Sequence, residues 1–304
     1  GGLLRGVRIN HCRDSAVTVG SWERGGDFTV DDCFFFNCTT SGQQIGQHVG
    51  AGAGIRYWGR GQGVIRLNNT VFDGCGATRQ ATNQNLYLQG GAVYINRGTQ
   101  LFTHNTLFKD CFLIGLPDES GCLKVGASAT LILSGMQSTE LINVTAFNSF
   151  LSSGNIHEAF QSHIRISCAV VKQCKFFNST GGPVLDGAIA RIEESQFVGV
   201  SGGAIVSRYT PSLLLRNCVF GDIDQLYSKN NVTIQDSTIY NVAYVNGEHQ
   251  HFVSCVLRDI EHINSHGGHI TMTNCTLENT NSVDFGTVLD ISDTSITITN
   301  SEAL

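Results

Sequence analysis

The chain has 304 residues and a formal net charge of −6, and its residues are 41% hydrophobic but only 14% charged. This composition is too apolar for a disordered chain and too poor in charged residues for a helical bundle or a coiled coil. Basic residues form no blocks, which argues against a nucleic-acid partner, and no apolar run reaches the roughly 18 residues of a membrane helix. The sequence opens without an initiator methionine or a signal peptide, so we expect a mature or internal piece of a longer chain.

A pattern that repeats along the whole chain predicts its architecture. In chain order, one position of each repeat, numbered 0 here, is Cys, Ser or Thr. It is occupied by Cys12, Cys33, Thr70, Thr106, Thr145, Cys174, Ser195, Cys218, Ser237, Cys255, Cys275 and Ser301. Successive members are 18 to 39 residues apart, which fits turns of about 20 residues with insertions in the first half of the chain. The long steps place surface loops near 41–53, 76–89, 112–121 and 152–163.

Apolar residues hold fixed places in each repeat. Position −3 is apolar in eleven of the twelve repeats, from Ile9 in the first to Ile298 in the last. Position +2 is Phe in seven successive repeats, at Phe35, Phe72, Phe108, Phe147, Phe176, Phe197 and Phe220. Period-two alternation predicts short strands, and stacking repeats about 4.8 Å apart would turn each place into a continuous column. We therefore expect one internal stack of these rings from Phe72 to Phe220.

Polar residues at positions −1 and +4 predict two bends in each repeat, because they are types that tolerate tight turns. Position −1 holds His11, Asp32, Asn69, Asn105, Gln173, Glu194, Asn217, Asp236, Ser254, Asn274 and Asn300. Position +4 holds Asn37, Gly74, Asp110, Ser149, Asn178, Gly199, Asp222, Asn241, Asp259 and Asn279. The sequence predicts one continuous all-β domain over 1–304, a single-stranded parallel β-helix (solenoid) of about 12 rungs with loop insertions in its N-terminal half.

Several segments resemble known families. Gly90-Gly91-Ala92-Val93, Gly202-Gly203-Ala204-Ile205 and the Phe-x-x-Asn segment Phe34 to Asn37 resemble the repeats of polymorphic outer membrane proteins, a family of surface-displayed adhesins. The whole pattern resembles the right-handed parallel β-helices of the pectin-lyase-like superfamily. The resemblance covers nearly the whole chain and implies a right-handed coil. It also directs attention to outward acids and bases, because related polysaccharide lyases and hydrolases place theirs on such a face.

A candidate catalytic group lies on the outward columns. Lys172, Glu193 and Arg216 follow one another at position −2, and Glu194 and Asp236 lie beside them at position −1. Two carboxylates two rungs apart would be separated by about 9.6 Å, the upper edge of the range for inverting glycoside hydrolysis. The alternative is a ladder of alternating charges with no catalytic residue. If the protein is an enzyme, Glu193, Glu194, Arg216 and Asp236 are its candidate catalytic residues.

Cysteine and histidine columns are further candidates. Position 0 favours a small buried side chain, which cysteine supplies. Neighbours one rung apart in a column also satisfy the Cα separation of a disulfide. The disulfide candidates are Cys12 with Cys33, Cys255 with Cys275, and Cys38, Cys75 and Cys111 at position +5. The 11 cysteines leave at least one thiol unpaired. His249 and His269, both at position −6, are either surface histidines or a two-histidine metal contact. No cofactor is predicted.

Six Asn-x-Ser/Thr sequons are either glycosylation sites or asparagines placed at bends. They are Asn37, Asn68, Asn143, Asn178, Asn231 and Asn274. Asn68 and Asn143 share the outward position −2 and are expected to be the most accessible. Trp22, Tyr57, Trp58 and Tyr87 lie at or beside the insertions, where they either stack on sugars or fold the loops back. Few lysines with many cysteines and asparagines fit a secreted glycoprotein.

Two hypotheses of function follow. The first is a non-enzymatic structural or adhesive protein, extracellular or on a cell surface, that forms a rod or a filament protomer. The second is a carbohydrate-active enzyme, a polysaccharide lyase or glycoside hydrolase, or a carbohydrate-binding β-helix. The first and last repeats carry no cap, so we expect end-to-end self-association.

Overall fold

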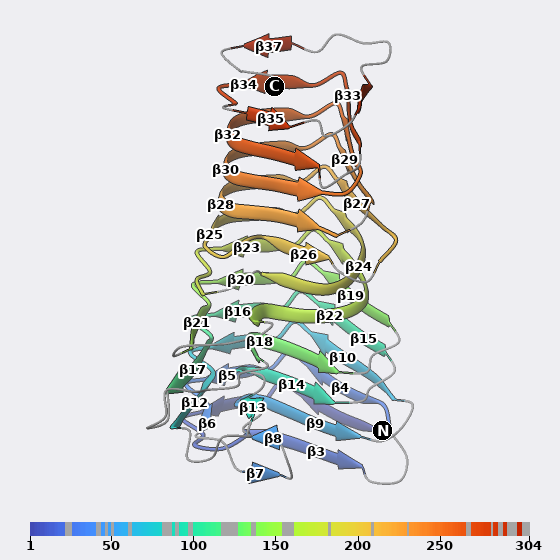
Figure 1. The fold of residues 1–304 in the computed structure, drawn as a ribbon. Coiled ribbons are helices and arrows are strands. Elements are labelled where there is room, and N and C mark those ends of the chain that lie inside the picture. Colours follow the sequence, from blue (N-terminus) through green and yellow to red (C-terminus); the bar gives the residue numbers. More distant parts are fainter. Residues whose placement is uncertain are drawn as a thin grey trace.

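The computed structural model describes residues 1–21, 26–40, 44–45, 48–49, 52–59, 63–80, 87–88, 91–96, 100–116, 127–134, 138–153, 161–181, 184–207, 210–229, 231–265, 269–280, 282–284, 288–290 and 297–299. These residues form strands and turns without a helix, and the strands stack into one continuous coil (Figure 1). Parallel pairing joins neighbouring rungs throughout the long sheet. The all-β parallel solenoid predicted from the repeats is confirmed.

Each rung contributes strands to three faces of the coil. The first face consists of β1 (Gly2–Arg5), β4 (Phe28–Asp31), β10 (Val64–Asn68), β15 (Gln100–His104), β19 (Ser138–Ile142), the ends of β22 (Gln161–Lys172) and β24 (Leu185–Glu193), β27 (Ser212–Arg216), β29 (Asn231–Gln235), β31 (Gln250–Val253), β33 (His269–Thr273) and β36 (Val288–Asp290). The second face consists of β2 (Arg8–Asn10), β5 (Phe34–Phe36), β11 (Val71–Asp73), β16 (Leu107–Lys109), β20 (Thr145–Phe147), β23 (Lys175–Phe177), β25 (Gln196–Val200), the starts of β28 (Val219–Ser228), β30 (Thr238–Gly247) and β32 (Val256–Ser265), β34 (Thr276–Glu278) and β37 (Thr297–Thr299).

The third face closes the coil. It consists of β3 (Val17–Ser21), β9 (Ile55–Gly59), β14 (Val93–Asn96), β18 (Ala127–Ser134), the starts of β22 and β24, β26 (Ile205–Ser207), the ends of β28, β30 and β32, and β35 (Ser282–Asp284). A four-stranded parallel sheet, β6 (Thr39–Thr40), β12 (Gly76–Gln80), β17 (Phe112–Leu116) and β21 (Phe150–Ser153), lies between the second and third faces in the first half. Two of the predicted loops therefore begin as strands, β12 and β17. β7 (Gln44–Ile45), β8 (His48–Val49) and β13 (Tyr87–Leu88) form a small separate sheet, in which β7 and β8 pair antiparallel.

Two turns in the left-handed region, five residues apart, bound the second face at eleven successive levels, from β2 to β34. All these residues have φ between 49° and 67°. Position −1 holds Gly6, Asp32, Asn69, Asn105, Asn143, Gln173, Glu194, Asn217, Asp236, Ser254 and Asn274. Position +4 holds His11, Asn37, Gly74, Asp110, Asn148, Asn178, Gly199, Asp222, Asn241, Asp259 and Asn279. Glycine and asparagine are the residues that enter this region most readily. Most of the predicted bends are confirmed. His11 is a turn residue but at position +4 instead of −1, and Asn148 takes the turn predicted for Ser149. Asn300 lies outside the described residues.

Position 0 follows the first turn and has a second physical role besides small size. Its hydroxyl or thiol donates a hydrogen bond to the carbonyl oxygen two residues earlier, at 2.7 Å from Thr70 to Asn68 and from Ser195 to Glu193, and at 3.3 Å from Cys33 to Asp31. The same carbonyl oxygen also accepts the backbone N–H of the turn residue one rung earlier, from Asp32 to Asn68 and from Gln173 to Glu193, so the side chain at position 0 occupies its second lone pair. Cysteine, serine and threonine therefore alternate in this column.

Phenylalanine rings stack along the inside of the second face. Ring centroids lie 4.9 Å apart between Phe35 and Phe72, and 5.0 Å apart between Phe72 and Phe108. A second stack joins Phe176, Phe197 and Phe220, with centroid separations of 4.8 and 5.1 Å. Every ring of both stacks is fully buried.

The predicted place of Phe147 in this stack is wrong, and so is Thr145 at position 0. β20 pairs Ala146 with Phe108, while Phe147 pairs with Lys109 and is partly exposed. The turns explain the shift by one residue. Asn143 and Asn148 lie five residues apart and occupy both left-handed sites, whereas the predicted register would force Val144 into one of them. A β-branched residue is strongly disfavoured in that conformation.

The first and last repeats were also misplaced. In the first rung Gly6 and His11 form the turns, so Val7 takes position 0 and Cys12 moves to position +5 beside Cys38. In the last rung Ile298 pairs with Leu277, which places it at +2 instead of −3. Ser301 lies outside the described residues.

Candidate functional site

The predicted catalytic group centres on a buried carboxylate. Glu193, at the end of β24, is 5% exposed. Its Oε1 lies 2.5 Å from Nη2 of Arg191 in the same strand and 2.5 Å from Nη2 of Arg216 in β27, the next strand of the first face. Two guanidinium groups on one carboxylate form charge-assisted contacts within one strand and between neighbouring strands.

Glu194 belongs to a different column, because it is itself the left-handed turn residue after β24. Its side chain is exposed, accepts a hydrogen bond from Gln173 Nε2 at 2.8 Å, and lies 3.5 Å from Nζ of Lys172. The hydrogen bond from Gln173, followed by the charge of Lys172, lowers the pKa of Glu194. Glu194 therefore favours the ionised state.

Asp236 lies two rungs further along the same turn column as Glu194 and is exposed. Its backbone N–H donates to the Val253 carbonyl, and no contact joins its side chain to Glu194 within the described chain. The structure thus gathers Glu193 and Arg216, leaves Glu194 and Asp236 on a separate column, and adds Arg191, which the sequence analysis missed. Arg191 could have been found by extending the outward alternation of β24 two residues back from Glu193.

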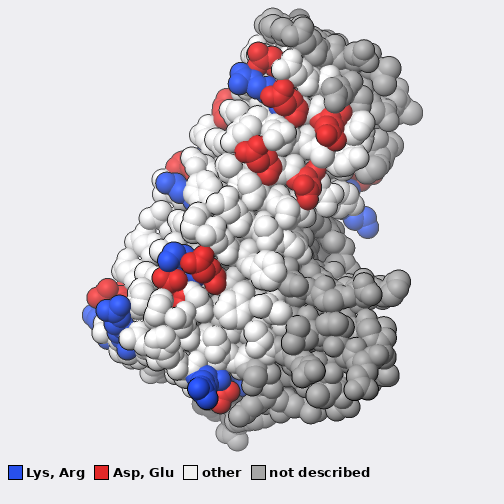
Figure 2. All heavy atoms as spheres, turned by 90° about the vertical axis from the view of Figure 1, so that its left-hand side faces the viewer, with Lys and Arg blue, Asp and Glu red and all other residues white. Residues whose placement is uncertain are grey.

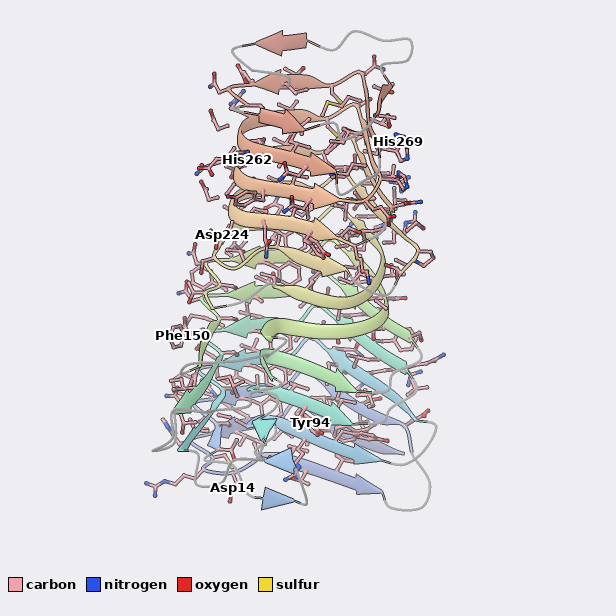
Figure 3. The ribbon with its side chains drawn as sticks, viewed as in Figure 1. Asp14, Tyr94, Phe150, Asp224, His262 and His269 are labelled. Carbon is pink, nitrogen blue, oxygen red and sulfur yellow. The ribbon has the colours of Figure 1, made fainter. Side chains whose placement is uncertain are left out.

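The predicted histidine neighbours do stack. The imidazole centroids of His249 and His269 lie 5.4 Å apart, and the backbone N–H of His269 donates to Nδ1 of His249 at 3.2 Å. This bond occupies one ring nitrogen of His249 as an acceptor. Among the described residues no group of three or more His, Cys, Asp or Glu side chains is arranged to hold a metal. His262, which stacks on Tyr244, belongs to the third face and lies apart from His269 (Figure 3).

The described cysteines are free thiols in two columns. Position +5 holds Cys12, Cys38, Cys75 and Cys111, and position 0 holds Cys33, Cys174, Cys218, Cys255 and Cys275. Cys12 and Cys33 therefore lie in different columns, so the predicted pairing of these two is wrong. The other disulfide candidates are neighbours in one column, but no disulfide bond joins them. Burial raises the pKa of Cys218 to about 11 and that of Cys174 to about 12, as expected of thiols that serve packing.

In two pairs of neighbouring cysteines, the two thiols of the pair are hydrogen-bonded to each other. Cys75 bonds to Cys38, which lowers the pKa of Cys38, and Cys255 bonds to Cys275, which lowers the pKa of Cys275. In each pair the pKa of the partner, Cys75 or Cys255, is raised by the same bond and by burial.

The sequons occupy three kinds of place. Asn37, Asn143, Asn178 and Asn274 are left-handed turn residues, Asn68 is half-buried at the end of β10, and Asn231 is exposed at the start of β29. The expected outward position −2 for Asn143 is wrong, and its Nδ2 donates to Asn105 Oδ1 at 2.9 Å. Asn37 and Asn178 pack against glycines of the next rung. A Cβ on Gly74 or Gly199 would lie 2.3 or 2.7 Å from the corresponding Oδ1.

Tyr57 is not available for stacking on sugars. It is 1% exposed, and its hydroxyl donates to the Gly26 carbonyl at 3.1 Å. Burial raises its pKa. The side chains of Trp22, Trp58 and Tyr87 lie outside the described part of the chain.

An apolar outer surface on the second face was missed altogether. Many of the outward positions +1 and +3 are apolar, and charged or polar residues such as Asp73, Lys109, Lys175, Gln196, Arg258 and Glu278 lie between them. The apolar members are Phe34, Phe36, Val71, Leu107, Phe147, Phe177, Val198, Val219, Tyr240 and Val256. We call this set the apolar stripe. Charges within it are mostly paired, Lys109 with Asp73 at 3.2 Å and Arg258 with Glu278 at 2.6 Å. Figure 2 shows uncharged surface between separate clusters of acidic and basic residues on this side of the coil. The recurrence of apolar residues at positions +1 and +3 is the sequence signal that predicts this surface.

No protein-family model matches this chain, and neither a curated protein nor a solved structure matches it. The resemblance to pectin-lyase-like β-helices and to polymorphic outer membrane proteins therefore stays a hypothesis, whereas the parallel coil is observed directly. None of the described segments forms an apolar helix of membrane-spanning length.

Proposed function

We propose that this chain is a non-enzymatic structural or adhesive protein of the cell surface or extracellular space, built as a stiff right-handed rod of about 12 rungs. The observation that carries the proposal is the unbroken parallel ladder. Inside it run the phenylalanine stacks, and along its turns run hydrogen-bonded polar side chains, such as Asn69 with Asn105 at 3.1 Å. Each rung is fixed to the next by backbone, core and turn contacts, which makes bending of the coil costly.

The charged group fits this function better than it fits catalysis. The Glu193 carboxylate contacts the guanidinium groups of both Arg191 and Arg216. Gln173 and Lys172 stabilise the ionised form of Glu194. A glycoside hydrolase needs one carboxyl whose pKa is raised so that it can act as an acid. The cluster supplies charge pairing between β22, β24 and β27 instead.

The same ladder offers a way for rods to associate end to end. Every rung presents the same row of N–H and C=O groups to the next rung, so a rung of a second protomer could continue the pairing. This association and glycans on the sequons belong to the proposal.

Surface labelling of the source cells tests it. Antibodies raised against the 304-residue chain should bind intact cells as strongly as permeabilised ones. Labelling only after permeabilisation would contradict a surface location. Loss of a polysaccharide-cleaving activity in Glu194→Gln or Asp236→Asn would replace the structural function with the enzymatic one.

A further inference from the structure

We infer that two pairs of neighbouring cysteines, Cys38 with Cys75 and Cys255 with Cys275, are oxidation sites at which a small-molecule disulfide links successive rungs covalently while the chain folds. Cys38 follows β5, and Cys75 follows β11, the paired strand of the next rung. Cys255 precedes β32 and Cys275 precedes β34, two strands that are paired in the same way. Each bond joins two rungs at a turn that bounds the second face.

The coil brings the two cysteines of each pair together. The backbone N–H of Gly76 donates to the Cys38 carbonyl at 3.0 Å, and that of Thr276 donates to the Cys255 carbonyl at 2.9 Å. The members of a pair therefore hold the same position on successive rungs, which are about 4.8 Å apart. A disulfide permits Cα separations of about 4.4–6.8 Å. In both pairs the two thiols also hydrogen-bond to each other.

The other buried cysteines at position 0 have no cysteine one rung away in their column. Their neighbours before and after are Val7 and Thr70 for Cys33, Val144 and Ser195 for Cys174, and Ser195 and Ser237 for Cys218. A cysteine two rungs away is about 9.6 Å distant, which is beyond the reach of a disulfide. The column therefore leaves these three thiols unbonded.

The column at position +5 contains four cysteines in succession, and their contacts favour the middle pair. The Cys75 thiol hydrogen-bonds to the Cys38 thiol. Cys111 instead meets backbone groups, among them the Phe72 carbonyl at 3.6 Å, and Cys12 contacts Cys38 through its backbone. We therefore assign the bond in this column to Cys38 and Cys75.

The turns keep their hydrogen bonds when the thiol protons are lost. Each of the four thiols donates to the carbonyl oxygen two residues earlier, at Phe36, Asp73, Val253 and Thr273. Each of these oxygens also accepts the backbone N–H of the turn residue one rung earlier, at 2.8 or 2.9 Å. A disulfide therefore leaves none of these four carbonyls without a donor.

The oxidation is a thiol–disulfide exchange with a low-molecular-weight disulfide, RSSR. In the unfolded chain the thiolate of one cysteine attacks RSSR, which breaks the bond between its sulfurs, forms a mixed disulfide and releases one RSH. As the rungs stack, the second cysteine attacks the protein sulfur of the mixed disulfide and expels RS⁻, which takes up the proton lost by the attacking thiol. The two cysteines lose two electrons, and RSSR gains them on becoming two RSH.

The bonds add to the proposed function without depending on it. A covalent link between rungs stabilises the rod because it restricts the unfolded chain. Disulfides persist outside the cell, the location that the proposed function gives the protein. The pairing itself needs only the coil and the oxidant, so its test uses the purified chain and does not depend on the location.

The experiment maps the disulfides of the 304-residue chain synthesised in a cell-free system, once with oxidised and reduced glutathione and once with a reductant alone. Circular dichroism checks the β structure, free thiols are alkylated in denaturant, and peptides are identified by mass spectrometry. In the glutathione sample we expect the bonds Cys38–Cys75 and Cys255–Cys275. The cysteines expected to be alkylated there are Cys33, Cys111, Cys174 and Cys218.

Two results would overturn the inference. Alkylation of all nine described cysteines in the folded glutathione sample would show that neither pair is an oxidation site. A Cys12–Cys38 or Cys75–Cys111 bond would show that the assignment at position +5 is wrong.

Serine variants test the stabilisation by the Cys255–Cys275 bond. Serine is native to this column at Ser237, whose hydroxyl donates to the Gln235 carbonyl at 2.7 Å, so Cys255→Ser keeps the local hydrogen bond and removes the disulfide. The oxidised wild type should have a Tm about 5 °C or more above that of the reduced wild type. Cys255→Ser should lose part of this difference.

The control is Cys218→Ser, because Cys218 lies in the same column without a cysteine neighbour. This variant should keep the whole difference in Tm between the oxidised and reduced chains. Cys75→Ser and Cys111→Ser make the same comparison at position +5, where Ser149 is a native serine. Equal losses in a variant and its control would contradict the assigned pair.

Discussion

At the scale of single residues, the turns determine which side chains enter the core. A residue in the left-handed region reverses the side-chain alternation, so its position decides whether the following Phe points inward or outward. Ala146 and Phe147 show the consequence, because the asparagine on each side of them fixes Ala146 inside. Phe147 consequently belongs to the outer surface.

Truncating Phe176 and Phe147 separates the two environments. Phe176→Ala should lower the free energy of unfolding by about 3–5 kcal/mol, because it opens a cavity beside Phe197 in a packed stack. Phe147→Ala should cost about 1 kcal/mol or less in the monomer, because that ring is partly exposed. Urea denaturation measures both. Equal losses would show that Phe147 belongs to the internal stack after all.

A substitution at Asn105 tests the turn column. Its φ is 49°, its Nδ2 donates to Asn69, and its Oδ1 accepts from Asn143. Asn105→Val should destabilise the protein by about 2 kcal/mol or more, since a β-branched residue is strained there and both hydrogen bonds are lost. Asn105→Gly keeps the conformation and should cost less. The control is Thr145→Val, an outward strand position, where a loss comparable to that of Asn105→Val would argue against the turn as the cause.

At the scale of elements, side chains in outward columns join one strand to the next. Lys172 at the end of β22 and Glu194 after β24 form one such connection, reinforced by Gln173. Exposed ion pairs contribute little to stability one by one, so the outward columns stabilise the coil through repetition along its length more than through any single pair.

This connection has a defined pH dependence. The folded pKa of Glu194 lies below its ordinary value of 4.5, so its stabilising contribution is present above that pH and is lost as the pH falls through the lowered pKa. The difference in unfolding free energy between the wild type and Glu194→Gln should therefore favour the wild type at neutral pH and disappear in strong acid. In a Gln173→Ala background the difference should shrink, because its main cause is gone. A difference that grows towards acid would contradict the assignment.

The repeats were predictable because inward positions and turn residues obey simple chemical rules at nearly every rung. Three rungs were misplaced, the first, the fifth and the last. In the first and the fifth, Cys12 and Thr145 imitate position 0 but the left-handed sites lie elsewhere. Searching for two turn-tolerant residues five apart, such as Gly6 with His11, would have corrected both. The Glu193 cluster was found only in part, because the outward alternation of β24 was not followed back from Glu193 to Arg191. The apolar stripe was missed because the prediction used the inward columns and not the outward positions +1 and +3.

At the scale of the whole molecule, the coil separates its surfaces by chemistry. Charged residues cluster on the outer side of the first face, apolar residues and paired charges share the outer side of the second face, and polar turn columns run between them. A rod of this kind can present one face to its surroundings while another is covered, which is consistent with the proposed role at a cell surface.

Glycosylation tests the proposed location of the protein at a cell surface or outside the cell. In chain isolated from its source or secreted by a eukaryotic host, we expect higher occupancy at Asn231 than at Asn143. Asn231 is exposed in β29, whereas the amide of Asn143 is bonded within its turn column. Glycopeptide mass spectrometry measures both sites, and Asn231→Gln should remove the larger mass. An unmodified Asn231 in native material would count against the glycoprotein assignment.

The most direct test of the account is a density map of the chain by electron cryomicroscopy at a resolution that separates rungs about 4.8 Å apart. We predict parallel neighbours along the whole described coil, with Phe35, Phe72 and Phe108 stacked inside and Phe147 on the outer surface. Antiparallel neighbours in the long sheet, or Phe72 and Phe108 on the solvent side, would contradict the stacked-rung architecture on which the proposed rod depends.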